Sequence, residues 1–365
     1  MTEQDLLLQI AAIPGRDRAA MDRAQARQDA LAKPPGSLGK LEEYAIRMAG
    51  ITGDISPRAD HCCVLVFAAD NGVVEEGVSC APQSVTQQQC INMTRFKTGM
   101  SSMAHHFGDD VLVTDVGVAA ELPPSIANRK IRYGTSNIAY TPAMTRQQAI
   151  DAIAVGMETA LQAKKDGAQV LGIGEMGIGN TTTSACVLAA LTGLSAADVT
   201  GRGGGLTDDA FSHKRSIVEQ ALSVHQPNQH DVIDILHKVG GLDISAMCGA
   251  YLGCAMARVP AVVDGYISIV AALCAARMCP AVRDMLFLSH ASYEKGYAVA
   301  AQELAQQPCL LLNMRLGEGS GCVLMFRILQ ASCAVMRNMA TFSEAAINDD
   351  YLSDIRKTDA FTVKS

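Results

Sequence analysis

The sequence has no tryptophan, few aromatic residues of any kind and no excess of positive charge. Aromatic residues make up 4% of the 365 residues, so we expect no stacking platform for single-stranded nucleic acid. The 37 acidic residues outnumber the 30 basic ones, and the basic residues are scattered along the chain. Because no positive field is present to attract phosphate backbones, the sequence predicts no nucleic-acid partner.

Long apolar runs, a signal peptide and closely paired cysteines are also missing. No apolar run reaches the roughly 18 residues that a membrane-spanning helix needs. The N-terminal sequence MTEQDLLLQIAAIPGRD has acidic residues before a short apolar stretch, unlike a signal peptide. None of the 12 cysteines forms a CxxC pair, and most lie among small apolar residues. We therefore expect reduced, structural cysteines, no membrane span and a cytoplasmic location.

What the chain does contain is 49% hydrophobic residues, arranged in short strand-like runs between helical stretches such as Met144–Lys165 and Asp231–Leu242. Continuous apolar strands separated by helices are typical of buried parallel strands. The predicted strands are Cys62–Ala69, Val111–Val116, Ala168–Ile173, Val259–Val263, Met285–Leu288 and Cys309–Asn313.

This pattern predicts an α/β fold, with an open parallel-sheet, Rossmann-like domain over residues 56–322. We also predict a smaller helical domain that is formed from both chain ends, residues 1–55 together with residues 323–365. Within that domain, Phe326–Met339 carries apolar residues at helical spacing and should pack with the N-terminal segment.

Polar residues and glycines follow the ends of the six predicted strands. Ligands of open α/β sheets bind beyond the carboxyl ends of the strands, at a topological switch point. Asp and Gly at one strand end are ordinary turn formers, but six such ends together predict one active-site crevice. The strand ends are Asp70-Asn71-Gly72, Asp115-Val116-Gly117, Gly174-Glu175, Asp264-Gly265, Ser289-His290 and a segment that leads through Arg315 to Gly317-Glu318-Gly319.

Two glycine-rich segments predict a phosphate site. The first, LGIGEMGIGNTTTSA (residues 171–185), has P-loop spacing but carries Asn180-Thr181 where a P-loop has Lys-Ser/Thr. Without that lysine the loop fits a single phosphate, held by backbone amides at a helix N-terminus. The second, GRGGGLTDD (residues 201–209), adds amides that can approach a ligand closely. Lys214 either supplies a positive charge to the phosphate or is a solvated surface lysine. The acidic residues of the sequence form no cluster with the spacing of metal ligands.

Motifs in one order along nearly the whole chain resemble a known family, the nicotinate-nucleotide–dimethylbenzimidazole phosphoribosyltransferases. The matching segments are KPPGSLGKLEEYA (33–45), AADNGVVEEGVS (68–79), PQSVT (82–86), GIGEMGIGNTT (172–182), GRGGGL (201–206), VVDGYIS (262–268), SHASYEKG (289–296) and RLGEGSG (315–321). The resemblance implies a cytoplasmic homodimer that moves the ribose phosphate of nicotinate mononucleotide to 5,6-dimethylbenzimidazole in cobalamin lower-ligand synthesis. It implies two small-molecule substrates and neither a cofactor nor a metal.

The resemblance also implies roles for particular residues. Glu318 matches the general base, which would take a proton from the attacking ring nitrogen. The other residues are expected to bind substrates: the nucleotide, its phosphate or the aromatic base. They are Glu175, Met176, Gly177, Gly179, Asn180, Thr181, Gly203, Gly204, Gly205, Lys214, Asp264, Ala81, Pro82, Gln89 and Leu316.

Three residues depart from the family pattern and bear on which base is preferred. Asn71 stands where histidine is common, Ala81 where larger or hydroxyl residues are frequent, and Tyr293 where a small residue is usual. Adenine, another benzimidazole or a phenol therefore stays open as the acceptor. A non-catalytic nucleotide-binding module is a second alternative. A dinucleotide-dependent oxidoreductase is a third, although no GxGxxG follows the first strand.

Overall fold

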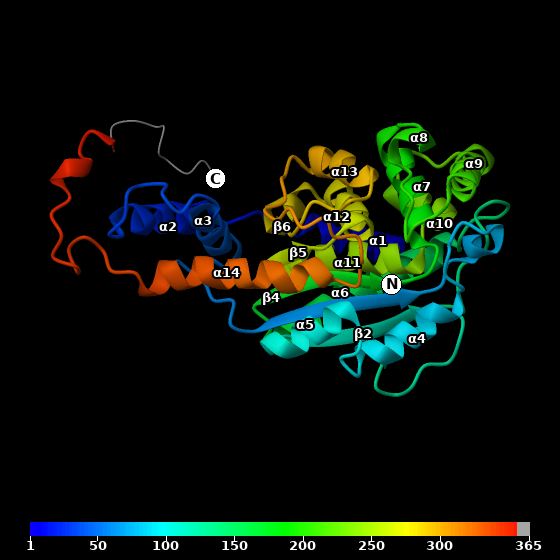
Figure 1. The fold of residues 1–365 in the computed structure, drawn as a ribbon, viewed down its shortest axis with the longest axis horizontal. Helices are drawn as coiled ribbons and strands as arrows, with labels where there is room; N and C mark the ends of the chain where they lie inside the picture. Colours follow the sequence, from blue (N-terminus) through cyan, green and yellow to red (C-terminus); the bar gives the residue numbers. More distant parts are fainter. Residues whose placement is uncertain (356–365) are drawn as a thin grey trace.

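One six-stranded parallel sheet organises the computed structural model, which describes residues 1–355 (Figure 1). The strand order is β3-β2-β1-β4-β5-β6. All residues of the central strands β1 and β4 are buried, as expected where helices cover both faces of a parallel sheet. The strands are β1 (Cys62–Ala69), β2 (Asp110–Gly117), β3 (Ala127–Asn128), β4 (Val170–Met176), β5 (Ala261–Val263) and β6 (Leu286–Leu288).

The predicted fold class and the first five predicted strands are confirmed, but the sixth predicted strand is wrong. Within Cys309–Asn313, only Leu310 forms a bridge, to His290, and the rest has no regular secondary structure. Leu311 is 82% exposed, so this apolar run has no second layer to pack against. The sixth strand is instead β3, whose two residues are too few to leave a periodic pattern. The third predicted strand, Ala168–Ile173, corresponds to β4. This strand continues to Met176, so Glu175 lies inside β4.

Helices cover both faces of the sheet. On one face lie α6 (Arg146–Lys165), α11 (Leu242–Ala257) and α12 (Tyr266–Met278), and on the other lie α4 (Ser84–Met93), α5 (Gly99–Phe107) and α14 (Ser320–Asn338). The predicted helix over 144–165 is α6, and that over 231–242 is α10 (Val232–Val239), which ends at Gly240. The remaining α-helices of the sheet region are α7 (Asn180–Thr192), α8 (Ala196–Val199), α9 (Asp208–His225) and α13 (Gly296–Leu304), and the 3₁₀ helices are η1 (Gly72–Glu76), η2 (Pro280–Met285) and η3 (Asp350–Leu352).

Two glycines set the close packing of α6 on α11. A Cβ atom on Gly156 of α6 would overlap the carbonyl oxygen of Ala246. A Cβ on Gly249 of α11 would overlap the carbonyl oxygen of Ile153. The two backbones are therefore in direct contact, and residues 242–255 of α11 are buried between α6, α12 and the sheet.

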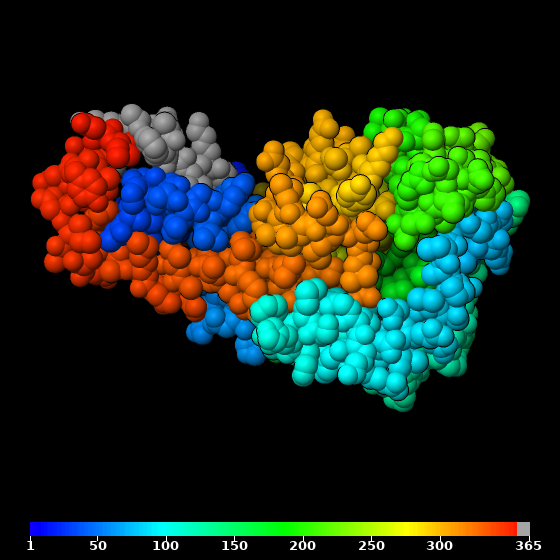
Figure 2. Space-filling view, viewed as in Figure 1, coloured from blue at the N-terminus to red at the C-terminus, as the bar shows by residue number. Residues whose placement is uncertain are grey.

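Both chain ends contribute to a helical unit beyond the edge of the sheet (Figures 1 and 2). It consists of α2 (Arg18–Ala30), α3 (Lys40–Thr52) and the far end of α14, and Leu31 forms a bridge with Thr341. Its apolar cluster is Met21, Ala24, Ala45, Ile46, Ala49 and Met336. The division into residues 1–55 with 323–365 and residues 56–322 stays a prediction, and residues 356–365 of it lie outside the described part.

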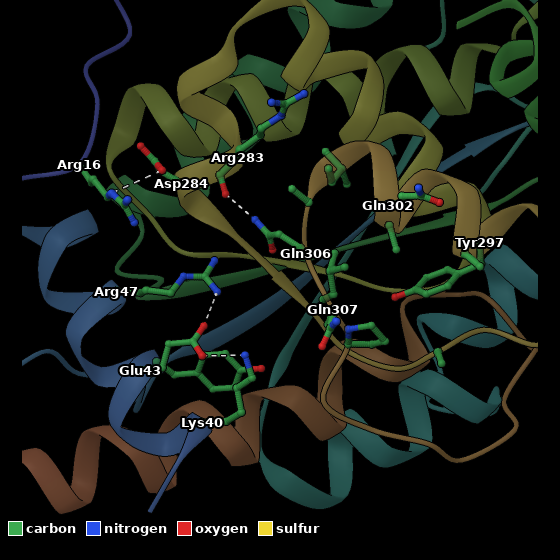
Figure 3. Close-up of a pocket in the computed structure, with 18 residues that line it drawn as sticks. Arg16, Lys40, Glu43, Arg47, Arg283, Asp284, Tyr297, Gln302, Gln306 and Gln307 are labelled. Atoms are coloured by element: carbon green, nitrogen blue, oxygen red, sulfur yellow. Dashed lines mark hydrogen bonds and ion pairs between the residues drawn. The ribbon is translucent and has the colours of Figure 1, made fainter. Parts of the chain in front are cut away.

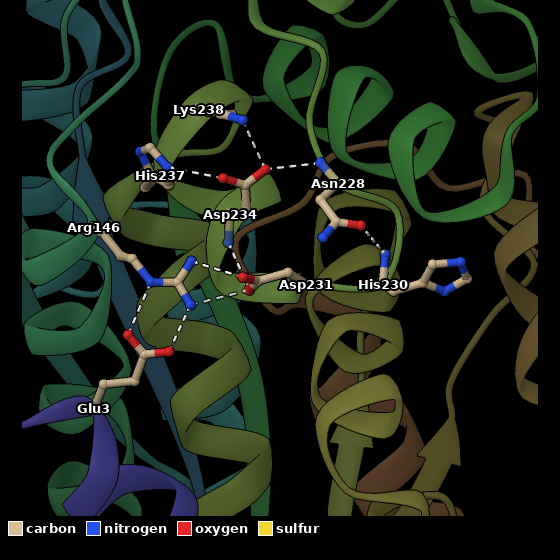
Figure 4. Close-up of polar contacts among 8 residues, drawn as sticks. All are labelled: Glu3, Arg146, Asn228, His230, Asp231, Asp234, His237 and Lys238. Carbon is tan, nitrogen blue, oxygen red and sulfur yellow. Dashed lines mark hydrogen bonds and ion pairs between the residues drawn. The ribbon is translucent and has the colours of Figure 1, made fainter.

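The first helix, α1 (Glu3–Ala11), packs on α6 (Figure 4). Arg146 at the start of α6 donates to Glu3 at 2.9 Å and pairs with Asp231 at 2.9 Å. Asp231 in turn caps α10 by accepting from the Asp234 amide at 3.0 Å. Because all three charged side chains are about one-third exposed, this network fixes the position of α1 more than it stabilises the fold.

The cysteines are all unpaired, and ten of the twelve are buried. Cys80 is exposed and Cys309 is partly buried. The expectation of structural rather than bridged cysteines is confirmed by this placement. Within residues 1–355, no helix is long and apolar enough to cross a membrane.

We predict that Gly249→Ala destabilises the protein, because the added methyl group forces α11 away from the backbone of α6. Overpacking of this kind costs on the order of 3 kcal/mol of unfolding free energy. Gly15→Ala is the matched control, since nothing lies within 4 Å of a Cβ at that position. Thermal unfolding of both variants checks this; equal melting temperatures would show that the helices are not in such close contact.

Candidate active site

A cavity of about 240 Å³ lies at the carboxyl ends of β4, β5 and β6. β1 pairs with both β2 and β4, so the chain leaves β1 in one direction and β4 in the other. The cavity therefore lies beside the topological switch point, where ligands of open α/β sheets bind. The lining residues come from the 79–89 segment that includes the start of α4, from the end of β4 and the start of α7, and from the loops around Gly203, Asp264, His290 and Glu318.

The structure brings most of the predicted site residues together. All of them line this cavity except Pro82, Gly205 and Lys214. Pro82 and Gly205 are exposed at its rim, whereas Lys214 is completely buried behind Thr181. The predicted residues that line the cavity are Ala81, Gln89, Glu175, Met176, Gly177, Gly179, Asn180, Thr181, Gly203, Gly204, Asp264, Leu316 and Glu318.

Glu318 enters the cavity from the loop that precedes α14. Its backbone has a φ of 65°, a conformation that non-glycine residues rarely adopt. The side chain is 4% exposed, and one carboxylate oxygen accepts from the Met100 amide at 3.2 Å. The other oxygen lies 3.5 Å from the Gln89 amide nitrogen, a weak contact. That second oxygen is therefore available to a ligand.

Asp264, at the end of β5, holds the loop that carries Glu318. Its two carboxylate oxygens accept from the backbone amides of Gly319 at 3.0 Å and Gly321 at 2.6 Å. Burial raises the pKa of Asp264 to about 7, and the backbone donors oppose that rise. A carboxylate at the N-terminus of α14 is also favoured by the helix dipole. The bonds of Asp264 thus fix the backbone on the C-terminal side of Glu318.

The phosphate loops meet at the N-terminus of α7. Gly179 begins the helix with a φ of 91°, and Asn180 and Thr181 form its first turn. Lys214 of α9 donates to the Thr181 hydroxyl at 2.7 Å, and a Cβ on Gly203 would lie 3.3 Å from the Lys214 ammonium. Burial lowers the pKa of Lys214 to about 8, while nearby Glu294 opposes this. The alternative of a solvated surface lysine is therefore wrong.

Glu175 lies between the phosphate loop and the Glu318 loop. It accepts a hydrogen bond from the Asn180 side chain, and a Cβ on Gly317 would lie 2.5 Å from its carboxylate. Burial raises the pKa of Glu175, and repulsion from the buried carboxylate of Asp243 raises it further. The cavity thus places two acidic side chains, Glu175 and Glu318, on adjacent elements.

His290 lines the cavity, as expected for one of the six predicted strand ends, although it was not among the predicted catalytic or substrate-binding residues. His290 is 1% exposed, and its Nδ1 lies 3.0 Å from the Ser289 hydroxyl and 3.9 Å from Asp264. Burial lowers the pKa of His290 to about 4, so the ring is neutral at pH 7. A signal was present, since Ser289-His290 ends a predicted strand. Met100, which binds Glu318, gave no signal, because it lies inside a helix far along the chain.

The three residues that depart from the family pattern lie in different places. Ala81 lines the cavity beside Val85 and Met176, on its apolar side. Tyr293 is 70% exposed and lines a neighbouring hollow with Arg202 and Phe211. Asn71 is fully buried beneath the cavity and contacts Asp243.

A larger cavity of about 850 Å³ lies elsewhere, beside the edge strand β6 and between α3 and α13 (Figure 3). Its charged side chains are largely paired with one another: Lys40 with Glu43 at 2.6 Å, Arg47 with Glu43 at 3.6 Å, and Arg16 with Asp284 at 3.5 Å. It contains none of the strand-end residues and no glycine loop. We therefore take the smaller cavity as the site.

A cluster suited to a metal ion is not found within residues 1–355. No group of three or more His, Cys, Asp or Glu side chains in that range could hold one. The acidic pair Asp208-Asp209 lies in the first turn of α9, where it complements the helix dipole.

Comparison with known proteins gives consistent matches over most of the chain. A family model for phosphoribosyltransferases matches residues 13–347. The nicotinate-nucleotide–dimethylbenzimidazole phosphoribosyltransferase of Clostridium perfringens strain 13 is 48% identical over 352 residues, covering 96% of this chain and 98% of that protein. The protein of the same name from Chloroflexus aurantiacus is 48% identical over 338 residues, with 92% and 96% covered. The crystal structure of CobT from Thermus thermophilus superposes with a TM-score of 0.87 at 41% identity, covering 91% of this chain and 99% of that one.

We predict that His290 makes the fold sensitive to acid. Its pKa in the folded protein lies below its ordinary value of 6.5, so the unfolded chain takes up the proton first as the pH falls. Stability is then lost between pH 6.5 and about 4, by on the order of 3 kcal/mol. In His290→Asn, the free energy of unfolding measured in denaturant should fall less over this range. The same substitution at exposed His106 is the control; equal losses for both would contradict the assignment.

Proposed function

Because the chain belongs to the nicotinate-nucleotide–dimethylbenzimidazole phosphoribosyltransferase family, we propose that it transfers the ribose 5-phosphate of nicotinate mononucleotide to 5,6-dimethylbenzimidazole. The products are nicotinate and alpha-ribazole 5′-phosphate, a precursor of the cobalamin lower ligand. The observation that carries this proposal is the arrangement of one cavity: a buried carboxylate with a free oxygen, Glu318, opposite two glycine-rich loops that end at a helix N-terminus.

Glu318 acts as the general base in this proposal. The attacking ring nitrogen forms a bond to C1′, and the bond from C1′ to the nicotinate nitrogen breaks with its electron pair going to nicotinate. The leaving group departs as a neutral ring nitrogen and needs no proton. The attacking aromatic ring loses its other N–H proton to Glu318. The oxygen that accepts this proton is the one that makes only a weak contact with Gln89. A proton acceptor placed in this way is worth roughly 10²–10⁴ in rate.

The phosphate is held by the loops at the start of α7. Gly177 and Gly179 line the cavity at the N-terminus of α7, and a helix N-terminus favours an anion. Gly203 and Gly204 close the other side, and the buried ammonium of Lys214 supports the phosphate through Thr181. Holding the ribose at one end and the base at the other brings C1′ and the ring nitrogen into line.

Glu175 lies between these two halves of the cavity and stabilises the positive charge that develops at C1′. Met176, Leu316 and Ala81 provide an apolar wall for the flat aromatic base. The small side chain of Ala81 leaves space there, so adenine, another benzimidazole or a phenol stays an alternative acceptor. We also propose that the protein works as a cytoplasmic homodimer, with residues 1–55 and 323–365 as a separate helical domain. A binding module without catalysis is disfavoured because one Glu318 oxygen makes only a weak contact, with Gln89, and can accept a proton.

We predict that Glu318→Gln abolishes turnover while nicotinate mononucleotide still binds, because glutamine fills the same space but accepts no proton. The wild-type protein and the variant are incubated with nicotinate mononucleotide and a mixture of dimethylbenzimidazole, adenine and a phenol, and the products are identified by mass. The wild-type protein should form alpha-ribazole 5′-phosphate preferentially.

Near-normal turnover of Glu318→Gln would remove Glu318 from the mechanism. Binding of nicotinate mononucleotide without release of nicotinate by the wild-type protein would support a binding module instead. Preferential use of another base would leave the reaction in place and change the acceptor.

We predict that Lys214→Ala weakens the binding of nicotinate mononucleotide about 10-fold to 100-fold, as expected for loss of a charged hydrogen-bonding partner. Because burial lowers the pKa of Lys214 to about 8, wild-type affinity should also fall as the pH rises above 8. Titration calorimetry checks both results, with the exposed Lys165→Ala as the control. Unchanged affinity in Lys214→Ala would exclude a role in holding the phosphate.

A further inference from the structure

The imidazole of His290 lines the active-site cavity, but the mechanism proposed above gives it no role. His290 follows β6 directly and is almost completely buried. Because burial lowers its pKa to about 4, the ring carries no charge at pH 7. A neutral imidazole has one nitrogen that donates a hydrogen bond and one that accepts. The contacts of the ring decide which nitrogen does which.

The Nδ1 atom of His290 is the donor. It lies 3.0 Å from the Ser289 hydroxyl, which itself donates to the backbone carbonyl of Asp264 at 3.1 Å. A hydroxyl group has a single proton, so the Ser289 oxygen can only accept from His290. The carboxylate of Asp264 lies 3.9 Å from Nδ1, too far for a hydrogen bond. Nδ1 therefore carries the proton, and Nε2 carries the lone pair.

The start of α14 fixes the position of the ring. Gly321, the second residue of α14, packs against the ring so closely that a Cβ there would lie 2.3 Å from Nδ1. The amide of Gly321 donates at the same time to the Asp264 carboxylate at 2.6 Å. A helix N-terminus disfavours positive charge, which agrees with a neutral imidazole. The ring is therefore held by the same backbone that positions Glu318.

The Nε2 side of the ring faces Gly265 in the cavity. A Cβ on Gly265 would lie 3.7 Å from Nε2 and 3.6 Å from the Ser292 hydroxyl, and all three residues line the cavity. Within residues 1–355, the hydrogen bond through Nδ1 is the only one that the ring makes. Leaving a buried acceptor without a donor is costly, so Nε2 is suited to a ligand that donates a hydrogen bond.

The lone pair of Nε2 limits which part of nicotinate mononucleotide it can bind. The phosphate and the nicotinate carboxylate are anions at pH 7 and repel a lone pair. The pyridinium nitrogen is bonded to C1′ and has no proton. The 2′ and 3′ hydroxyls of the ribose are therefore the hydrogen-bond donors of this nucleotide. The N–H proton of the attacking aromatic ring goes to Glu318 and not to His290.

We propose that His290 is a substrate-binding residue whose Nε2 accepts a hydrogen bond from a ribose hydroxyl of the nucleotide. Ser289 is a positioning residue, because its oxygen keeps the proton of the imidazole on Nδ1. This inference rests on the proposed function, in which the ribose lies between the phosphate loops and Glu318. Asp264 then serves both ends of the reaction: its carboxylate positions the Glu318 loop, and its carbonyl orients His290 through Ser289.

Titration calorimetry with nicotinate mononucleotide and with its 2′-deoxy and 3′-deoxy forms tests this assignment. The wild-type protein should bind at least one deoxy form about 10-fold more weakly, as expected when a buried acceptor loses its donor. In His290→Phe the ring has no acceptor, so this loss should disappear for one of the two hydroxyls. The hydroxyl for which it disappears is the one that His290 binds. Nicotinate mononucleotide itself should bind His290→Phe about 10-fold more weakly.

Two further variants distinguish binding from a merely structural role. His290→Gln places an amide oxygen near the position of Nε2 and should keep part of the discrimination against the deoxy form. Ser289→Ala removes the partner of Nδ1, so the proton is free to move to Nε2 and the discrimination should fall. Ser289→Ala also keeps the test available if circular dichroism shows that His290→Phe does not fold. His106→Phe, at an exposed position, is the matched control and should keep the full discrimination.

Nitrogen NMR of the ¹⁵N-labelled protein measures the tautomer directly. The signals of His290 are identified by their absence in His290→Gln. At pH 7 without ligand, Nδ1 should be protonated and Nε2 should not. Nicotinate mononucleotide should shift the Nε2 signal in the direction of an accepted hydrogen bond, and the deoxy form that lacks the bound hydroxyl should not. A protonated Nε2 in the wild-type protein would overturn the inference.

Two calorimetric results would also overturn the inference. One is equal affinity of the wild-type protein for all three nucleotides, and the other is the same discrimination in the wild-type protein, His290→Phe and Ser289→Ala. Either result would leave the proposed function in place if Glu318→Gln is inactive and the wild-type protein forms product. Failure of the wild-type protein to bind nicotinate mononucleotide would instead contradict the proposed function, so the two failures are distinguishable.

Discussion

The rest of the site depends on the hydrogen bonds between Asp264 and the backbone at the start of α14. Two backbone amides, those of Gly319 and Gly321, donate to its carboxylate and fix the loop that carries Glu318. This loop crosses directly over β4, because a Cβ on Gly174 would lie 2.6 Å from the Glu318 carbonyl oxygen. The position of Glu318, the general base, is thus set by the ends of β4 and β5, two strands of the parallel sheet.

The site concentrates buried acids around a ligand that carries both signs of charge. Glu318, Asp264 and Glu175 line the cavity and Asp243 is buried behind it, while the buried ammonium of Lys214 lies towards the phosphate loops. Burial makes ionisation of the carboxylates costly, so their charge responds to what enters the cavity. This separation of the carboxylates from the Lys214 ammonium suits a substrate with a cationic ring at one end and a phosphate at the other.

Much of this could be predicted from the sequence, because buried parallel strands and glycine loops leave strong local patterns. The first five strands, the helix after Gly179 and the gathering of strand ends at one edge are examples. The family resemblance supplied the role of Glu318. Contacts between distant segments could not be predicted: Met100 on Glu318 and Asp243 beneath Gly177 depend on packing. The run Cys309–Asn313 failed as a strand because apolar character alone does not provide a neighbouring strand.

A crystal structure with nicotinate mononucleotide and dimethylbenzimidazole bound to an inactive variant tests the central claim most directly. We predict that the phosphate lies on the 177–181 and 203–204 segments. We also predict that a ring nitrogen of the base lies within hydrogen-bonding distance of residue 318. A phosphate bound away from both loops, or a side chain at position 318 that points into bulk solvent with both substrates present, would contradict it.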